Sequence, residues 1–190
     1  MYIAIDRRAN LNTQHLKEMH KLRARIFKER KDWEVSVIAE MEIDGYDALD
    51  PYYMIMSHGD ADTNVSGCWR ILPTTGPNML AHTFPELLHG APAPCSETVW
   101  ELSRFAIEAP DKSAFNFSDV STIAIRSIVE FAMNQGIKQF VTVTTVGVEK
   151  MLRRLGLDIS RFGPSIKVGI ENAVALNVEL NAKTWAALNK

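Results

Sequence analysis

The stretch TVWELSRFAIEAP, residues 98–110, predicts a sheet strand that carries polar side chains in an otherwise apolar segment. Because successive side chains of a strand point to opposite faces, we expect Glu101, Ser103 and Phe105 on one face and Arg104 on the other. Polar groups on both faces are unusual in a strand whose role is only structural. The stretch therefore predicts a layered fold in which one strand of the sheet also serves a ligand pocket.

The segments on either side of this strand predict the remaining elements. Apolar periodicity and turn residues predict further strands at residues 2–5, 52–58, 65–73, 138–147 and 173–180. They predict helices at residues 12–30, 84–90, 120–136, 148–156 and 181–190, with Ser118 or Asp119 capping the third and Gly90 closing the second. Residues 31–51 are expected to be rich in loops. This order of elements predicts one α/β or α+β domain, residues 1–190, in three layers.

The composition excludes several functional classes. The chain has 190 residues, 46% hydrophobic and 23% charged, with a net charge of −2, which is ordinary for a globular domain and gives no case for nucleic acid. No apolar run approaches the roughly 18 residues of a membrane helix, and no signal-like apolar region opens the chain, so we expect a cytoplasmic protein without membrane insertion. Neither the two cysteines nor the five histidines have metal-ligand spacing, so no metal site is expected.

Charge is distributed in blocks along the chain. Residues 17–31 hold seven basic side chains, residues 34–62 hold eight acidic ones without lysine or arginine, and residues 150–167 hold five basic ones. Solvated helix faces are the usual explanation for such blocks. Two basic patches on either side of an acidic segment are also suited to an anionic partner and a cationic ligand.

Two further arginines lie in apolar surroundings. Arg70 lies within GCWRIL, and Arg23 lies one helical turn from Met19 and Phe27. A guanidinium keeps its charge in a protein, so a buried one requires a carboxylate partner or an anionic ligand. The nearest carboxylates are those of EMEIDGYDALDP, residues 40–51. For Arg23, a side chain that reaches out to solvent is an equally good interpretation. A calcium loop is not predicted from the acids, because the D-x-D-x-D-G pattern is absent.

Several segments together resemble the acyl-homoserine-lactone (autoinducer) synthases of the LuxI type. The resemblance is carried by MHKLRARIFKERKDWEVSV, EMEIDGYDALDPYYM, GCWRILPTTGP, FPELLHG and WELSRFAIE, and by VTVTTVGVEKMLRRLGLDISRFGP and GIENAVALNVELNAKT, which are similar to the long-chain 3-oxo-acyl members. It covers nearly the whole chain. It implies a three-layer α/β/α sandwich with a mixed central sheet, similar to the GNAT acyltransferases. It also implies that the substrates are S-adenosylmethionine and an acyl group on acyl carrier protein, with no separate cofactor.

The resemblance also implies roles for individual residues. The residues that match the family's substrate-binding pattern for S-adenosylmethionine are Arg23, Phe27, Trp33, Asp44, Asp47, Arg70 and Arg104. Glu101, directly or through a water, would deprotonate the substrate amine, with Ser103 as an alternative, and burial would raise the pKa of Glu101. Arg104 would hold the substrate carboxylate. Asp44 and Asp47 would meet the cationic end of the substrate or fix the loop.

Two further sets of residues follow from the same resemblance. The acyl chain would lie against Trp69, Met79, Leu102, Phe105, Thr142, Thr144, Met151, Leu155 and Leu157, with Thr144 at the position associated with 3-oxo chains. Core packing and the β-propensity of threonine explain these residues equally well. The acidic carrier protein would dock on the basic residues Lys150, Arg153, Arg154, Arg161 and Lys167.

Two alternative functions have different sequence signatures. A GNAT-type N-acyltransferase that uses acyl-CoA is disfavoured, because no glycine-rich loop of the Q/R-x-x-G-x-G/A kind is present. A non-catalytic binder of lipid or carrier protein would be expected to have lost Glu101 or Arg104, and both residues are present.

Overall fold

The computed structural model describes residues 1–59, 62–108 and 114–189, and it has a mixed α/β fold. These residues form two compact units. The first unit consists of Met1–Ile71 and Arg104–Ala124, and the second of Leu72–Ser103 and Ile125–Lys190. The strands include both parallel and antiparallel pairs, which confirms the prediction of a mixed sheet. That the whole chain acts as a single domain stays a prediction.

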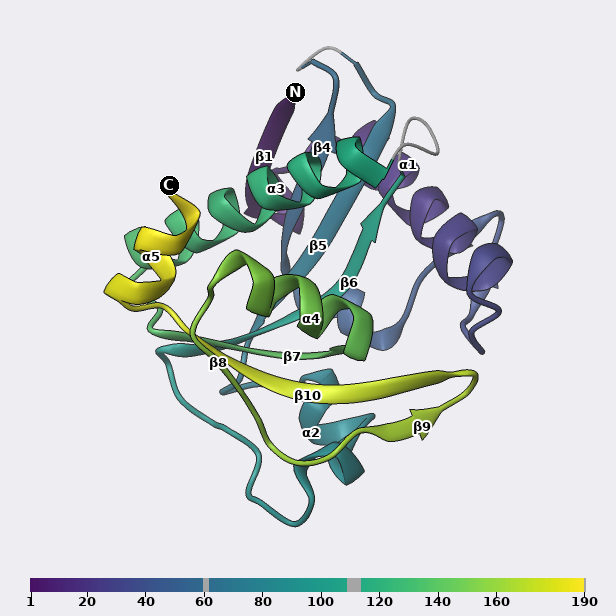
Figure 1. Ribbon diagram of the computed structural model, residues 1–190. Helices are drawn as coiled ribbons and strands as arrows, with labels where there is room; N and C mark the ends of the chain where they lie inside the picture. The colour runs from purple at the N-terminus through teal and green to yellow at the C-terminus, as the bar shows by residue number, and fades with distance from the viewer. Residues whose placement is uncertain (60–61, 109–113, 190) are drawn as a thin grey trace. The chain divides into compact units, whose positions relative to one another are not determined.

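The strands predicted at residues 2–5, 52–58 and 65–73 are present and lie side by side (Figure 1). β1 (Tyr2–Arg7) pairs antiparallel with β4 (Tyr52–Ser57), and β4 pairs antiparallel with β5 (Val65–Pro73). The next strand is the C-terminal part of β6 (Val99–Ile107). The register places Tyr53 opposite Arg70, so one sheet position holds a phenol and a guanidinium side by side.

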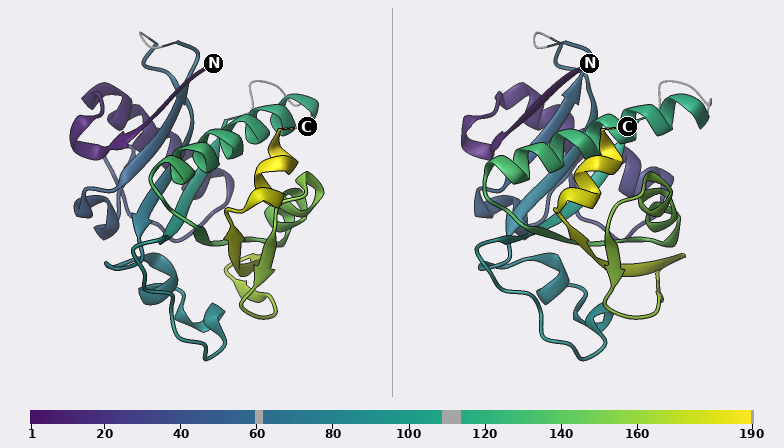
Figure 2. Two further views of the ribbon diagram at one scale, coloured as in Figure 1. Left: turned by 90° about the vertical axis from the view of Figure 1, so that its left-hand side faces the viewer. Right: turned by 60° about the vertical axis from the view of Figure 1, so that its left-hand side comes forward.

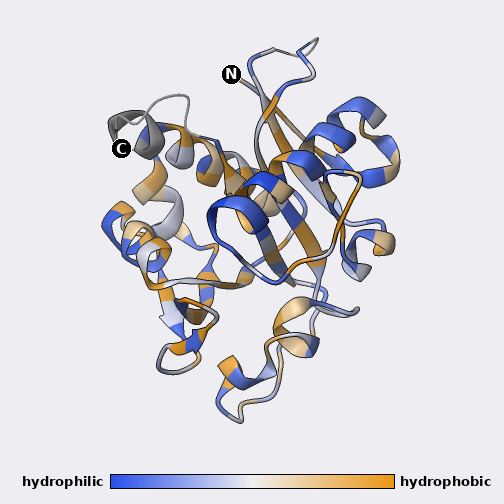
Figure 3. Ribbon diagram, turned by 90° about the vertical axis from the view of Figure 1, so that its right-hand side faces the viewer, coloured by the Kyte–Doolittle hydropathy of each residue, from blue (hydrophilic) through white to orange (hydrophobic). Residues whose placement is uncertain are grey.

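The predicted helix at residues 12–30 is present, although its second half is wound more loosely. Asn12 caps α1 (Thr13–Arg23) by accepting hydrogen bonds from the backbone N–H groups of Gln14 and His15. The chain then continues as η2 (Ala24–Arg30), a π-helix, a form often found at functional sites. Along both segments hydrophobic residues interrupt a mainly hydrophilic sequence, as Figure 3 shows.

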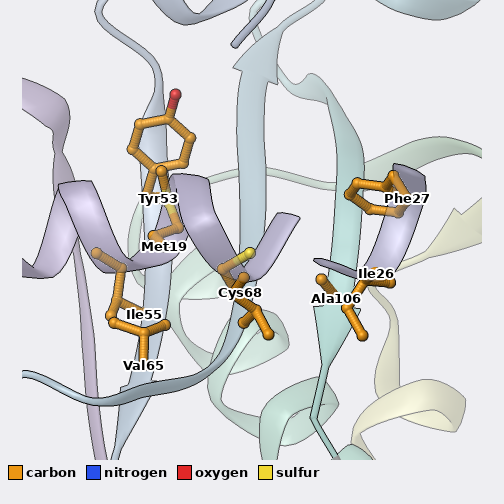
Figure 4. Close-up of a cluster of buried hydrophobic side chains, with 9 residues drawn as sticks. Met19, Ile26, Phe27, Tyr53, Ile55, Val65, Cys68 and Ala106 are labelled. Carbon is orange, nitrogen blue, oxygen red and sulfur yellow. The ribbon is translucent and has the colours of Figure 1, made fainter. Parts of the chain in front are cut away.

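The hydrophobic residues of this helix bury themselves against the sheet of the same unit. Figure 4 shows most of the cluster, which comprises Met19, Leu22, Ile26, Phe27, Tyr53, Ile55, Val65, Cys68 and Ala106. The Cys68 thiol lies inside this cluster, and burial raises its pKa to about 12. The helix and the strands are therefore joined by one hydrophobic core, which fixes the backbone from which the polar side chains project.

Residues 31–51, expected to be rich in loops, contain three short elements. β2 (Val37–Ile38) and β3 (Met41–Glu42) form a hairpin that the sequence did not predict, with Ala39 and Glu40 at positive φ in its turn. The 3₁₀ helix η3 (Gly45–Leu49) follows, and Asp44 and Asp47 form a capping box at its start. The acidic segment is thereby folded into a defined shape beside α1.

Further paired strands (Figure 2) and a second hydrophobic core belong to the second unit. The N-terminal part of β6 pairs parallel with β7 (Gln139–Thr145), which pairs antiparallel with β10 (Glu171–Glu179). β8 (Ile159–Arg161) and β9 (Ile166–Val168) also pair with β10, and neither was predicted. The buried core is formed by Leu80, Leu87, Leu88, Val141, Ala173 and Ala175.

The remaining helices mostly match the predicted ranges. They are η1 (Arg8–Asn10), α2 (Met79–His82), η4 (Pro85–Leu88), α3 (Ala114–Asn134), α4 (Val146–Leu155) and α5 (Ala182–Leu188). The prediction that Ser118 or Asp119 caps α3 is wrong, because the preceding residues already continue the helix from Ala114. The C-cap of η4 is His89 in the left-handed region, one residue before the predicted Gly90. Of the helices described, none is both long and apolar enough to cross a membrane.

Candidate active site

Six charged side chains of the first unit form one cluster. Its positive members come from α1, β5 and β6, and its negative members from the folded acidic segment: Arg23, Arg70, Arg104, Glu42, Asp44 and Asp47. Three positive and three negative charges cancel. The structure thus confirms that the arginines predicted in apolar surroundings are paired with carboxylates of residues 40–51. It also decides the position of Arg23, which is buried rather than extended to solvent.

Asp47 lies at the centre of the cluster. Its two carboxylate oxygens accept hydrogen bonds from Arg23 Nη1 at 2.8 Å and Nη2 at 3.0 Å, from Arg70 Nη1 at 2.8 Å and from the Tyr53 hydroxyl at 2.5 Å. The Asp44 backbone N–H donates a further bond at 2.8 Å. A carboxylate offers about four acceptor sites, so Asp47 has none left for a ligand. Of the two roles expected for Asp47, this geometry favours fixing the loop.

The charges around Asp47 control the protonation of the groups at the centre of the cluster. Burial alone would raise the pKa of Asp47, but the hydrogen bonds and charges of Arg23 and Arg70 hold it well below its usual value. The pKa of Tyr53 is raised, first by burial and then by the negative charge of Asp47. Asp47 is therefore a carboxylate and Tyr53 a neutral donor at any pH at which the cluster is assembled.

Glu42 is the member of the cluster that the sequence did not predict to be functional. Its side chain is completely buried between two arginines. Arg23 donates from Nε to Glu42 Oε2 at 2.5 Å, and Arg104 donates from Nε to Oε1 at 3.1 Å. Arg104 Nη2 lies 3.0 Å from the same Oε1. The only signal available from the sequence was the position of Glu42 two residues before Asp44 in an acid-rich segment.

Asp44 and Arg104 form the accessible edge of the cluster. The side chains of Asp44 and Arg104 are 19% and 10% exposed, whereas those of Arg23, Arg70, Glu42 and Asp47 are between 0% and 4% exposed. Asp44 Oδ1 accepts a hydrogen bond from Arg70 Nη1 at 2.5 Å. Asp44 Oδ2 lies 2.8 Å from Arg104 Nη2 but has no partner with hydrogen-bond geometry among the described residues. Asp44 and Arg104 are thus the most exposed side chains of the cluster, although the Oδ2 atom of Asp44 is itself buried.

The backbone at Arg104 is unusual. Its φ of 58° lies in the left-handed region, which costs a residue with a side chain about 1–3 kcal/mol. The predicted alternation of faces along residues 98–108 is therefore wrong beyond Ser103, because this conformation interrupts the strand pleat. Backbone strain of this kind is concentrated at functional sites, which is consistent with a role for the Arg104 guanidinium.

An aromatic pair lies beside Arg104. The rings of Phe27 and Trp33 are stacked, with centroids 5.2 Å apart and planes 13° apart. The Arg104 guanidinium carbon lies 5.5 Å from the centre of the Phe27 ring, and Lys31 Nζ lies 4.8 Å from the Trp33 ring. The structure thus brings together all seven residues predicted to bind the first substrate: Arg23, Phe27, Trp33, Asp44, Asp47, Arg70 and Arg104.

Glu101 and Ser103 lie in the second unit, on the part of β6 that leads into Arg104. Glu101 is 1% exposed, and its two oxygens accept hydrogen bonds from the backbone N–H groups of Met79 at 3.0 Å and Leu80 at 2.6 Å. These donors belong to the first residues of α2, so the carboxylate is held in one orientation. Ser103 is also buried.

The residues predicted to contact the acyl chain fall into two groups. Met79, Leu102, Thr142 and Leu157 of the second unit are buried, and Thr144, Met151 and Leu155 are half-buried. The Thr142 hydroxyl donates to the Leu102 carbonyl oxygen at 2.8 Å, so this hydroxyl is already occupied. In the first unit the rings of Trp69 and Phe105 are packed with centroids 4.3 Å apart. The buried Trp69 Nε1–H has no acceptor among the described residues.

The five basic residues predicted to dock a carrier protein are exposed and belong to the second unit. Two of them share one buried carboxylate. Glu149 accepts from Arg153 Nε at 3.0 Å and from Arg161 Nε at 2.8 Å, and the hydrogen bonds of Arg161, with those of Arg153, lower the pKa of Glu149. Within the described residues, Lys150, Arg154 and Lys167 take part in no ion pair. These three are therefore the charges most available to a partner.

The comparisons with known proteins agree with this geometry. The sequence profile described as Autoinducer synthase matches residues 8–188. The chain is 60% identical over 188 residues to the acyl-homoserine-lactone synthase of Pseudomonas aeruginosa, which covers 99% of this chain and 94% of that protein. The described histidine, cysteine and acidic residues include no group of three or more that could hold a metal ion.

Solved structures give the same relationship. The crystal structure of the acyl-homoserine-lactone synthase LasI superimposes with a TM-score of 0.92 at 60% identity, over 98% of this chain and 93% of that one. The structure of TofI in a ternary complex with an inhibitor and MTA has a TM-score of 0.85 at 33% identity, over 100% of this chain and 97% of that one.

More distant structures share the fold alone. BjaI, a CoA-dependent acyl-homoserine-lactone synthase, has a TM-score of 0.87 at 24% identity, over 98% of this chain and 87% of that one. A putative N-acetyltransferase from Lactobacillus plantarum has a TM-score of 0.62 at 12% identity, over 95% of this chain and 100% of that one. The predicted likeness to acyltransferases of the GNAT type is thereby confirmed at the level of the fold.

Proposed function

Because the chain belongs to the autoinducer synthase family and is an acyl-homoserine-lactone synthase, an acyltransferase that makes a quorum-sensing signal, we propose its two substrates and the roles of its site residues. The proposed substrates are S-adenosylmethionine and a long 3-oxo-acyl group on acyl carrier protein, and no further cofactor takes part. The proposed location is the cytoplasm, and residues 1–190 act as one synthase domain.

The accessible edge of the charged cluster supports the first substrate. S-adenosylmethionine carries a carboxylate, an ammonium and a sulfonium, and the edge presents one guanidinium and one carboxylate to it. On binding, Arg104 exchanges Asp44 for the substrate carboxylate, and the freed Asp44 accepts the substrate ammonium. The rest of the cluster stays in place because it is buried and fully paired. The proposal rests on the ion pair of Asp44 and Arg104 at this edge, because Asp44 Oδ2 has no hydrogen-bond partner among the described residues.

The aromatic pair supports the same substrate. Phe27 and Trp33 provide a flat apolar surface next to the Arg104 guanidinium, which is suited to the adenosyl part. TofI, which is 33% identical to this chain, binds MTA, the abbreviation we take for methylthioadenosine, the product expected here. We assign Phe27 and Trp33 to the adenosyl side and Arg104 and Asp44 to the amino-acid end.

The proposed reaction has two bond-forming steps. In the first, Glu101 takes a proton from the substrate ammonium, directly or through a water, and the amine attacks the acyl thioester, so that an amide forms and the carrier thiol leaves. In the second, the substrate carboxylate attacks its own γ-carbon, closing the lactone and releasing methylthioadenosine. Both nucleophiles belong to the substrate, so the main task of the protein is orientation. Arg104, which holds the carboxylate, serves both steps.

A 3-oxo-acyl chain requires a hydrogen-bond donor in an otherwise apolar environment. Two of the residues predicted to contact the acyl chain offer such a donor. The Thr144 hydroxyl is half-buried on β7, and the Trp69 Nε1–H is buried without an acceptor among the described residues. The Trp69 N–H has already lost its water in the folded chain, so a ketone oxygen that reaches it gains a hydrogen bond at little further cost.

The basic surface of the second unit supports acyl carrier protein as donor, because that partner is acidic. BjaI uses CoA instead, but its 24% identity to this chain is evidence for the fold alone. The test is a donor comparison with purified protein and S-adenosylmethionine. A long 3-oxo-acyl group is supplied either on acyl carrier protein or on CoA, and lactone and methylthioadenosine are quantified together. The proposal requires equimolar products and a clearly higher kcat/KM with the carrier protein. A preference for CoA would refute the donor assignment.

A further inference from the structure

Glu42 lies between Arg23, which is fully buried, and Arg104, which lies at the accessible edge of the cluster. Its Oε2 accepts from Arg23, whose side chain is 0% exposed. Its Oε1 accepts a hydrogen bond from Arg104 Nε at 3.1 Å and lies 3.0 Å from Arg104 Nη2. Two guanidinium nitrogens in contact with one carboxylate oxygen fix both the place and the plane of the Arg104 guanidinium.

The backbone of Glu42 is held as firmly as its side chain. Glu42 pairs with Val37 in the β2–β3 hairpin, and His20 Nδ1 of α1 donates to the Glu42 carbonyl oxygen at 2.8 Å. Burial, followed by the positive charge of Arg23, lowers the pKa of His20, so the ring is a neutral donor at pH 7. The main chain of Glu42 is therefore attached to α1, which also supplies Arg23.

The two carboxylates that contact Arg104 differ in what they can release. Asp44 is partly exposed, and its Oδ2 has no hydrogen-bond partner among the described residues. Glu42 cannot move away from Arg104 without also breaking its buried hydrogen bond from Arg23 Nε, which is unfavourable for a buried ion pair. When a ligand carboxylate approaches, Arg104 therefore gives up Asp44 and keeps Glu42.

We propose that Glu42 is a positioning residue that holds the Arg104 guanidinium for the carboxylate of the amino-acid substrate. The inference rests on the proposed function of Arg104. Glu42 does not touch the substrate itself. It keeps Arg104 in one orientation during the exchange, so that the nitrogens not bound to Glu42 face the ligand. Glu42 therefore contributes to the binding affinity only of ligands that carry a carboxylate.

The experiment compares two ligands that differ in this one group. Dissociation constants for S-adenosylmethionine and its decarboxylated form are measured by calorimetry on the wild type, Glu42→Gln and Glu40→Gln. We expect wild type to prefer the carboxylate-bearing ligand and Glu42→Gln to reduce that preference about tenfold, the size typical of a lost charged hydrogen bond. Glu40→Gln, an exposed position of the same hairpin, is expected to leave both constants unchanged. Equal weakening of both ligands in Glu42→Gln would show a merely structural role and overturn the inference.

Two further measurements keep the outcome decisive. If Glu42→Gln does not fold, Glu42→Asp takes its place, because it keeps the charge for Arg23 but is one methylene too short to hold both arginines. An unchanged preference in Glu42→Asp overturns the inference. In an Arg104→Gln background, changing Glu42 should have no further effect on the preference, because Glu42 acts through Arg104. If the wild type itself shows no preference for the carboxylate, the proposed role of Arg104 fails, and the inference fails with it.

Discussion

Arg23 and Asp47 form a two-point ion pair, with Nη1 2.8 Å from Oδ1 and Nη2 3.0 Å from Oδ2. Arg23 is the last residue of α1, and Asp47 lies in the first turn of η3. The pair therefore ties the acidic segment to the helix before any ligand arrives. The site is in this sense pre-organised, since the substrate has to displace one edge contact only.

Asp47→Asn should destabilise the folded state strongly. The substitution leaves the buried charges of Arg23 and Arg70 undercompensated, and the cost of breaking such a buried network is about 3–5 kcal/mol. Urea unfolding of the variant and the wild type measures this loss of free energy of unfolding. Asp50→Asn is the matched control, because Asp50 is 44% exposed and both its ion pair with Arg7 and its hydrogen bond from the Ala9 N–H are exposed, so the loss of its charge should cost less than about 1 kcal/mol. A small effect at Asp47 would disprove its structural role.

His20 should make the stability depend on pH between about 7 and 5. Burial and the charge of Arg23 lower the pKa of His20 below its unfolded value of about 6.5. As the pH falls through that value, the unfolded chain takes up a proton that the folded chain does not. Stability is then lost at up to about 1.4 kcal/mol per pH unit until the lower folded pKa is reached. His20→Gln should reduce this loss in urea unfolding at pH 7 and 5, and an identical loss in both proteins would contradict the assignment.

Trp69→Phe tests the hydrogen bond proposed for the 3-oxo group. The variant keeps an aromatic ring against Phe105 and removes the N–H donor. We expect the ratio of kcat/KM for 3-oxo-acyl to unsubstituted donors to fall about three- to tenfold, the effect of one hydrogen bond. Thr144→Val makes the same test for the hydroxyl. If neither variant alters the ratio, neither the Trp69 N–H nor the Thr144 hydroxyl forms a hydrogen bond that selects 3-oxo-acyl chains.

Reversing Arg154 and Lys167 to glutamate should raise the KM for acyl carrier protein and leave the KM for S-adenosylmethionine unchanged. Both residues are exposed, and neither forms an ion pair within the described residues, so their charge is available to an acidic partner. The difference from wild type should shrink at high salt, because salt screens exposed charges. Lys183→Glu is the control, because this lysine is already paired with Asp158. An unchanged KM for the carrier protein would remove the docking assignment.

Glu101→Gln should lower kcat by about 10²–10⁴, the usual contribution of a positioned base. An amide cannot accept the proton, although it is close in size and can still accept one of the backbone hydrogen bonds from Met79 and Leu80. The measurement is the rate of methylthioadenosine release under saturation. Urea unfolding of the variant is the control for its stability. Near-normal turnover would assign the proton transfer to another group.

Much of the site could be predicted from the sequence, because buried arginines demand partners. The positions of Arg70 and Arg104 in apolar strands predicted that each has a carboxylate partner or an anionic ligand, and the acids at residues 40–51 were the nearest candidates for such a partner. For Arg23 the sequence left burial and exposure equally open, because its partners lie 19 and 24 residues further along the chain. Only the fold of the acidic segment decides between the two.

The features that escaped prediction have local causes without a sequence signal. Glu42 is buried and Glu40 exposed because the hairpin turns at Ala39 and Glu40, two non-glycine residues at positive φ. Arg104 takes a left-handed backbone conformation that arginine itself does not favour. β8 and β9 have three residues each, too few for a periodic pattern. Backbone strain and short strands depend on packing between segments that are distant in the sequence, so no short stretch of the chain predicts them.

The most direct measurement is mass spectrometry of organic extracts from cells that express this chain, Glu101→Gln or an empty vector, with equal soluble protein in the first two. The account predicts acyl-homoserine lactones dominated by one long 3-oxo-acyl chain in the first extract, and a strong reduction in the second. A dominant unsubstituted chain would contradict the proposed acyl specificity. Absence of any lactone from cells that contain soluble wild-type protein would contradict the account as a whole.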